Sequence, residues 1–118
     1  MADKCDEYTE DTIIGMAKAI LDKITGLESS AAVDIRAYIL ECEIMPMIYN
    51  MYSVIDYRKP GVAVEASIKS FGIAIKWALG AFISASPDKK AMSAAIRANG
   101  DYDSLKRHNF TVGLIGNK

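Results

Sequence analysis

The residues of this chain that could carry out catalysis do not occur in the spacing of a known catalytic motif. The only histidine, His108, stands between Arg107 and Asn109. A histidine that acts as a general base needs an orienting partner and a pocket, and basic neighbours disfavour its charged form. Glu41 and Glu43 are two positions apart, so they do not share a face of a helix. We therefore expect no catalytic residues and a protein that is not an enzyme.

The sequence also lacks the local motifs that hold metals and cofactors. It contains no CxxC, HExxH or EF-hand loop for a metal ion, and neither GxxxxGK[ST] nor GxGxxG for a nucleotide phosphate. The acidic residues among the first ten positions precede an expected helix, where such residues typically form a solvated cap. We expect no metal site, no cofactor and no small-molecule substrate.

A set of basic residues in the second half of the chain is the constellation best suited to binding. Its members fall on one face of an expected helix and on the segment after the next loop, with Tyr102 and Phe110 nearby to stack on bases. Such residues neutralise phosphates without reading a base sequence. The predicted site for nucleic acid or an acidic partner consists of Lys89, Lys90, Arg97, Lys106, Arg107 and His108.

One observation weighs against nucleic acid as the partner, and a second interpretation of the basic residues stays open. The isoelectric point, about 5.8, lies below the basic value typical of nucleic-acid-binding domains. The basic residues are equally consistent with ordinary solvated helix faces. Arg58, Lys59, Lys69 and Lys76 are further basic residues that can add to the same side.

The net charge of −1 hides a strong polarity between the two halves of the chain. Residues 1–57 carry a net charge of −7 and residues 58–118 carry +6. Such polarity indicates a charged partner, or self-assembly in which the acidic half of one copy meets the basic half of the next, head to tail. The alternative is that the two halves interleave in space and give a mixed surface.

Two further patterns indicate surfaces on which helices could pack. Small residues recur at steps of four between positions 62 and 84, and they allow a second helix of this domain or of a partner to approach closely. They are Ala66, Ser70, Ala74 and Ala78. Methionines 45, 47 and 51 and tyrosines 49, 52 and 57 form either part of the core or an adaptable apolar groove for a partner helix.

Hydrophobic spacing and capping residues predict an all-α protein, a compact bundle of five or six helices. Residues 1–8 are expected to be a flexible acidic lead and residues 9–118 one helical domain. Pro46 should break a helix within two residues, and Arg58-Lys59-Pro60-Gly61 should separate two helices. Ser86 should cap the helix that follows it. The expected helices cover roughly 10–25, 29–45, 47–57, 62–84, 87–98 and 104–109.

The helix at 62–84 is expected to lie at the centre of the bundle. Its apolar residues, among them Phe71, Ile75, Trp77, Leu79 and Phe82, are spread around the whole helix and should leave no wide face in water. The apolar stretch 71–85 contains Lys76 and is shorter than the roughly 20 residues that span a membrane. We therefore expect a core helix and no membrane contact.

These observations together favour a cytoplasmic accessory subunit that binds rather than catalyses. We expect it to assemble with itself or with larger proteins, and its basic second half to contact a nucleic-acid backbone, as small helical subunits of ribonucleoprotein complexes do. The alternative function is an interaction or inhibitor module that binds a partner protein through the apolar methionine and tyrosine groove.

Overall fold

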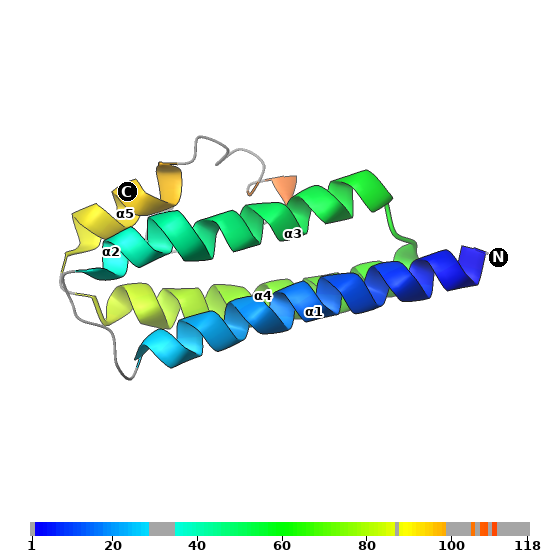
Figure 1. Cartoon of the computed structure of the whole chain (residues 1–118), viewed down its shortest axis with the longest axis horizontal. Helices are drawn as coiled ribbons and strands as arrows, with labels where there is room; N and C mark the ends of the chain where they lie inside the picture. The colour runs from blue at the N-terminus through cyan, green and yellow to red at the C-terminus, as the bar shows by residue number, and fades with distance from the viewer. Residues whose placement is uncertain are drawn as a thin grey trace.

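Helices account for the fold of the chain, and three of them run along the long axis of an elongated molecule (Figure 1). The computed structural model describes residues 2–28, 35–86, 88–98, 105, 107, 108 and 110. These residues have extents of 49 × 28 × 19 Å. The elements are α1 (Ala2–Glu28), α2 (Arg36–Ile39), the π-helical turn η2 (Leu40–Ile44), α3 (Met45–Arg58), α4 (Val62–Ser84) and α5 (Lys89–Arg97).

The described residues contain no strand, which confirms the all-α prediction. The expected number of five or six helices is not matched. Because α2, η2 and α3 follow one another without a gap, they form a single helical run, and the described residues make four helices. Of the short helix predicted at 104–109, the structure describes residues 105, 107 and 108. The first residues of the helix predicted at 29–45, positions 29–34, lie outside the described residues.

Helix α1 supplies the surface on which the other long helices pack. Ile13, Ala17, Ile20 and Ile24 recur at steps of three or four, and all are fully buried. This stripe packs chiefly against α4 and α3. The helix begins at Ala2 and not near residue 10. The expected start of the first helix near residue 10 is therefore corrected, because helical structure extends from Ala2 onward.

Pro46 marks a change of helix type. The π turn ends at Ile44 and α3 begins at Met45, with Pro46 in its first turn. The predicted boundary at Pro46 is therefore only a change of helix type within one continuous helical run, because Met45 stays in the α region with φ −61° and ψ −42°. The Met45 amide donates to the carbonyl of Leu40, the i to i+5 pattern of a π-helix. A proline ring clashes with the carbonyl four positions before it, and the wider π turn makes room there.

The turn between α3 and α4 lies where the sequence predicted it. Helix α3 ends at Arg58 and is followed by the cap residue Lys59, whose backbone adopts the left-handed conformation with φ 50° and whose amide donates to the Ile55 carbonyl over 2.9 Å. Gly61 is extended and precedes the first residue of α4. The chain therefore reverses here within three residues, and α4 runs back beside α1 and α3 (Figure 1).

Helix α4 is not at the centre of the bundle, which corrects the prediction for residues 62–84. Ile75, Leu79 and Phe82 are fully buried and Phe71 is half-buried, but Trp77 is 76% exposed. The described residues cover one side of α4, mainly through α1. Apolar residues spread around a helix were expected to mean burial on every side, whereas here they leave an apolar side in contact with solvent.

Helix α5 is capped by Asp88 and not by Ser86. The Asp88 carboxylate accepts the Ala91 amide over 3.0 Å. Ser86 is 2% exposed, and its hydroxyl donates to the carbonyl of Phe82 over 2.8 Å. The serine therefore belongs to the end of α4, and the predicted Ser86 cap is corrected.

Arg36 ties the start of α2 to the end of α4. It is 8% exposed, and its Nη1 donates to the Phe82 carbonyl over 3.3 Å and to the Ser86 hydroxyl over 3.5 Å. The guanidinium carbon lies 4.8 Å from the centre of the Phe82 ring. A cation is favourable at the carboxyl end of a helix, where unpaired carbonyls gather. This contact therefore fixes the position of α2 against α4.

We expect Arg36→Ala to lower the free energy of unfolding by about 2–3 kcal/mol, because it removes charge-assisted hydrogen bonds and the packing on Phe82. Arg36→Met keeps the apolar stem and should cost about 1 kcal/mol. Urea unfolding followed by circular dichroism measures both values. Equal losses for the two variants would show that the aliphatic packing contributes nothing.

Candidate functional site

An exposed apolar strip runs along the outer side of α4. Its large members are Val62, 83% exposed, Ile73, 52% exposed, and Trp77, 76% exposed. Small residues fill the positions between them, and the strip, here called the α4 face, consists of Val62, Ala66, Ser70, Ile73, Ala74 and Trp77. Single exposed apolar residues are common on proteins, but several on one face typically mark a contact site.

The sequence places this face outward because the opposite side of α4 is more strongly apolar. Ile75, Leu79 and Phe82 lie on that opposite side and pack in the core. Next to them, the Ser67 hydroxyl donates to the Glu10 carboxylate over 2.8 Å and so fixes α4 against α1. With this side held on α1, the residues half a turn away have no covering helix among the described residues.

The predicted helix-contact stripe lies largely on this face. Ala66, Ser70 and Ala74 are exposed, and only Ala78 is partly buried against the core. The interpretation that this stripe packs inside the domain is therefore wrong for its first three residues. A contact with another molecule stays a prediction.

By length and composition, the segment Val64–Ser84 is apolar enough to cross a membrane, and most of it is not buried. This finding does not distinguish a membrane from a protein surface as the covering for the α4 face. Lys69 and Lys76 lie within the segment. A charge inside a spanning segment is costly, which favours a protein contact.

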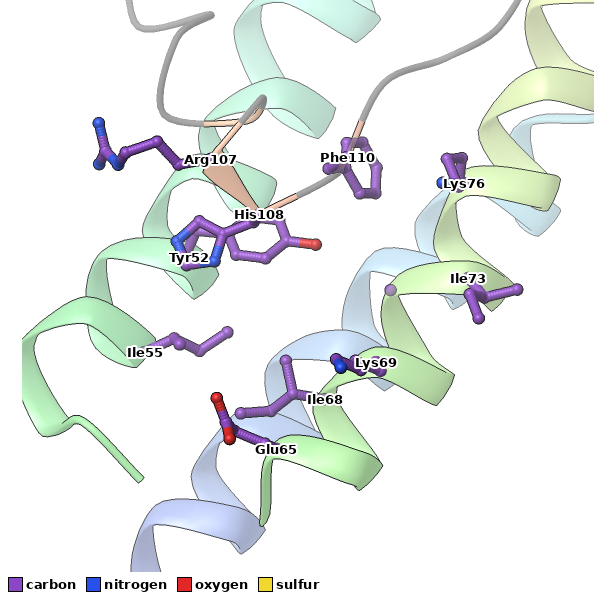
Figure 2. A pocket seen from close by; sticks show the side chains of 11 residues that line it. Tyr52, Ile55, Glu65, Ile68, Lys69, Ile73, Lys76, Arg107, His108 and Phe110 are labelled. Carbon is purple, nitrogen blue, oxygen red and sulfur yellow. The ribbon is translucent and has the colours of Figure 1, made fainter. Parts of the chain in front are cut away.

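A cleft of about 520 Å³ adjoins the α4 face on the side of α3. It exists because α3 and α4 both pack mainly on α1. Tyr52 and Ile55 come from α3, and Glu65, Ile68 and Lys69 lie across from them on α4 (Figure 2). The whole lining of this α3–α4 cleft is Tyr52, Ile55, Glu65, Ile68, Lys69, Gly72, Ile73, Lys76, Arg107, His108 and Phe110.

Three aromatic rings form the inner end of the α3–α4 cleft. The rings of Tyr52 and His108 stack with their centres 4.4 Å apart, and Phe110 meets Tyr52 edge-on at 5.7 Å. Desolvation by burial raises the pKa of Tyr52 to about 12. The Tyr52 hydroxyl also lies close to α4, because a Cβ on Gly72 would be 3.2 Å from it. Gly72 thus keeps the cleft open beside this hydroxyl.

The charges around the α3–α4 cleft are mainly positive. Lys69, Lys76 and Arg107 line it together with one carboxylate, that of Glu65. Asp56 lies just outside, where it accepts a hydrogen bond from the His108 ring at 2.8 Å and forms an ion pair with Arg107 at 3.6 Å. A concave site with an apolar floor and several cations at its rim suits an anionic group attached to an apolar body. The described residues contain no cluster of potential metal ligands.

The structure separates the predicted basic set into two places. Lys89 donates to the Ser84 carbonyl over 3.0 Å, so it caps the end of α4. Lys90 and Arg97 are exposed on α5, at one end of the molecule (Figure 1). Arg107 and His108 lie instead against α3 at the cleft, and Lys106 lies outside the described residues.

From the sequence, Lys69 and Lys76 were expected only as additions to the basic set, and the exposure of Trp77 was not predicted. A usable signal was present, because Lys69 and Lys76 are seven positions apart and therefore share a helical face. The predicted charge polarity is partly neutralised within the chain, since Asp56 of the acidic half contacts Arg107 and His108 of the basic half. At this contact, therefore, the acidic and basic halves of the chain interleave in space.

The predicted methionine and tyrosine groove is not open. Met45, Met51 and Tyr52 are buried in the core. Met47 and Tyr49 are partly buried, and the Tyr49 hydroxyl donates to the Ile96 carbonyl over 3.3 Å. Only Tyr57 is well exposed. Most of these residues therefore pack α3 against the core, whereas Val62, Ile73 and Trp77 leave an apolar strip exposed on α4.

Comparison with protein-family models, with curated proteins and with solved structures gave no match to the chain. The functional argument therefore depends on the α4 face and the α3–α4 cleft.

The raised pKa of Tyr52 predicts loss of stability in alkali. The folded chain holds the phenol proton more tightly than the unfolded chain, whose tyrosines titrate near pH 10. This contribution is fully present below pH 10 and is lost as the pH rises toward 12. We expect Tyr52→Phe to make the unfolding midpoint less dependent on pH between about 10 and 12. An unchanged slope in that variant, with Tyr57→Phe as control, would contradict the assignment.

Proposed function

We propose that this protein is a non-enzymatic helical subunit that works inside the cell by binding, and that it assembles with another protein chain through the α4 face. The observation that carries the proposal is the exposure of Trp77 between Ile73 and the small residues of the same face. Tryptophan is among the residues that contribute most to protein contacts. An isolated chain would leave this apolar area in water, at about 25 cal/mol for each Å².

The small residues of the α4 face support a helix as the contacting element. Ala66, Ser70 and Ala74 have short side chains that let a second backbone approach, while Trp77 and Ile73 project beside them. Ridges of large side chains fit into the grooves that small side chains leave. The face therefore has both the bulk and the gaps that helix packing needs.

We expect Trp77→Ser to abolish assembly of the purified chain while leaving its unfolding midpoint nearly unchanged, because the indole is exposed and makes little contact inside the fold. Sedimentation velocity at several protein concentrations measures assembly. The matched control is Tyr57→Ser, which removes another exposed aromatic ring, 84% exposed, from the end of α3.

Assembly through the α4 face should also persist at high salt, since apolar contacts are not screened. Assembly that vanishes at high salt, or that tolerates Trp77→Ser and not Tyr57→Ser, would contradict the proposal. Such a result would instead support the head-to-tail contact between the acidic and basic halves.

A second candidate function is contact with a nucleic-acid backbone in the α3–α4 cleft. The observation that favours it is the gathering of Lys69, Lys76 and Arg107 around one cleft, although Arg107 is distant from the two lysines in the sequence. Phosphate contacts of this kind are independent of base sequence and weaken with salt. Lys90 and Arg97 on α5 could extend the contact only along a different part of the molecule.

If the cleft binds a phosphate backbone, Lys69→Ala and Arg107→Ala should each lower the slope of log affinity against log salt by about one unit. The loss of affinity should be the same for oligonucleotides of different sequence. Filter binding of single-stranded oligonucleotides at two or more salt concentrations measures this slope. Lys90→Ala is the control, and an equal effect of that variant would show that the cleft has no special role.

A further inference from the structure

We infer that the occupant of the α4 face is the same face of a second copy of this chain, packed antiparallel about a two-fold axis near Ser70. This inference rests on the proposed function and names its partner. A two-fold contact requires a surface that is complementary to itself. The sequence of sizes and charges along α4 meets that requirement in one register.

The sizes along the α4 face are complementary about Ser70. In an antiparallel pair that crosses there, Ser70 of each copy meets Ser70 of the other, and Ala66 lies opposite Ala74. The short side chains thus lie at the crossing, where two helices come closest. Trp77 lies opposite Val62 of the other copy, so the two most exposed apolar residues of the face cover each other.

The charges beside the face are complementary in the same register. Glu65 and Lys76 both lie on the side of α4 that lines the α3–α4 cleft. A two-fold axis between antiparallel helices keeps equivalent flanks on the same side of the pair. Glu65 lies before Ser70 and Lys76 lies after it, at nearly equal distances along the helix. In the antiparallel pair, each Glu65 therefore lies beside Lys76 of the other copy. A parallel pair about a two-fold axis would instead place the two cleft flanks on opposite sides of the contact, so Glu65 and Lys76 of different copies would not meet.

Charge exchange tests this register. Sedimentation equilibrium of the full chain at low salt should show a dimer. Glu65→Lys alone and Lys76→Glu alone should each weaken it about tenfold, since attraction becomes repulsion at two symmetric positions. An equimolar mixture of the two variants should recover the affinity as a heterodimer, and so should the double variant. Lys90→Glu and Asp22→Lys, equivalent changes at exposed positions on α5 and α1, should leave the dimer unchanged.

A cross-link tests the crossing point independently of charge. In a chain with both natural cysteines, Cys5 and Cys42, replaced by serine, Ser70→Cys should form a disulfide-linked dimer under mild oxidation. Paired cysteines need Cα atoms about 4.4–6.8 Å apart, which the crossing provides. Ser84→Cys, which is exposed but far from the crossing, should remain monomeric under the same conditions.

The outcomes separate this inference from the proposed function. A wild-type chain that is monomeric at all concentrations, yet binds another protein in a manner that depends on Trp77, overturns the self-association and leaves the proposed function standing. If Glu65→Lys alone dimerises as well as the wild type, the chain self-associates in another register, which overturns the antiparallel pairing about Ser70 and also leaves the proposed function standing. Binding of the monomer to neutral phosphatidylcholine vesicles that Trp77→Ser abolishes overturns both, because a lipid surface then covers the face.

Discussion

The buried stripe of α1 is the surface on which α3 and α4 both depend. Ile13, Ala17, Ile20 and Ile24 present one narrow apolar strip, and two long helices pack against it. Because both rest chiefly on α1, they diverge enough to leave the α3–α4 cleft between them. The same arrangement covers α4 on one side only. The cleft and the α4 face are therefore two consequences of a single packing arrangement.

Local signals in the sequence predicted local structure well. The turn at 58–61 and the change of helix type at Pro46 depend on glycine and proline, whose effects on the backbone act within a few residues. The position of α4 could not be predicted in this way. Its apolar residues surround the helix, so their spacing does not indicate which side faces the core. Ser86 misled for a similar reason, since a serine before a proline suits a cap, while tertiary contact with Arg36 recruited it to the end of α4.

The candidate site was predictable only in part because its residues meet through tertiary packing. Neighbouring basic residues in the sequence suggested one patch, but Lys89 caps α4 and Arg107 lies at the cleft. Lys69 and Lys76 join Arg107 there only because α4 runs back beside α3. Likewise Asp56 neutralises part of the basic half, a contact that a count of charges in each half of the sequence does not reveal.

The two candidate functions are linked by geometry if α4 pairs as inferred. An antiparallel two-fold pair places both α3–α4 clefts on the same side of the contact, so the cations of two copies would gather along one surface. A polyanion long enough to reach both clefts would make its second contact intramolecularly. Its overall affinity would then exceed its affinity for a single cleft. It would also stabilise the dimer by the same free energy, since binding and assembly are reciprocal. A basic surface could thus arise in a chain of net charge −1, because assembly, and not composition, would concentrate its positive charge.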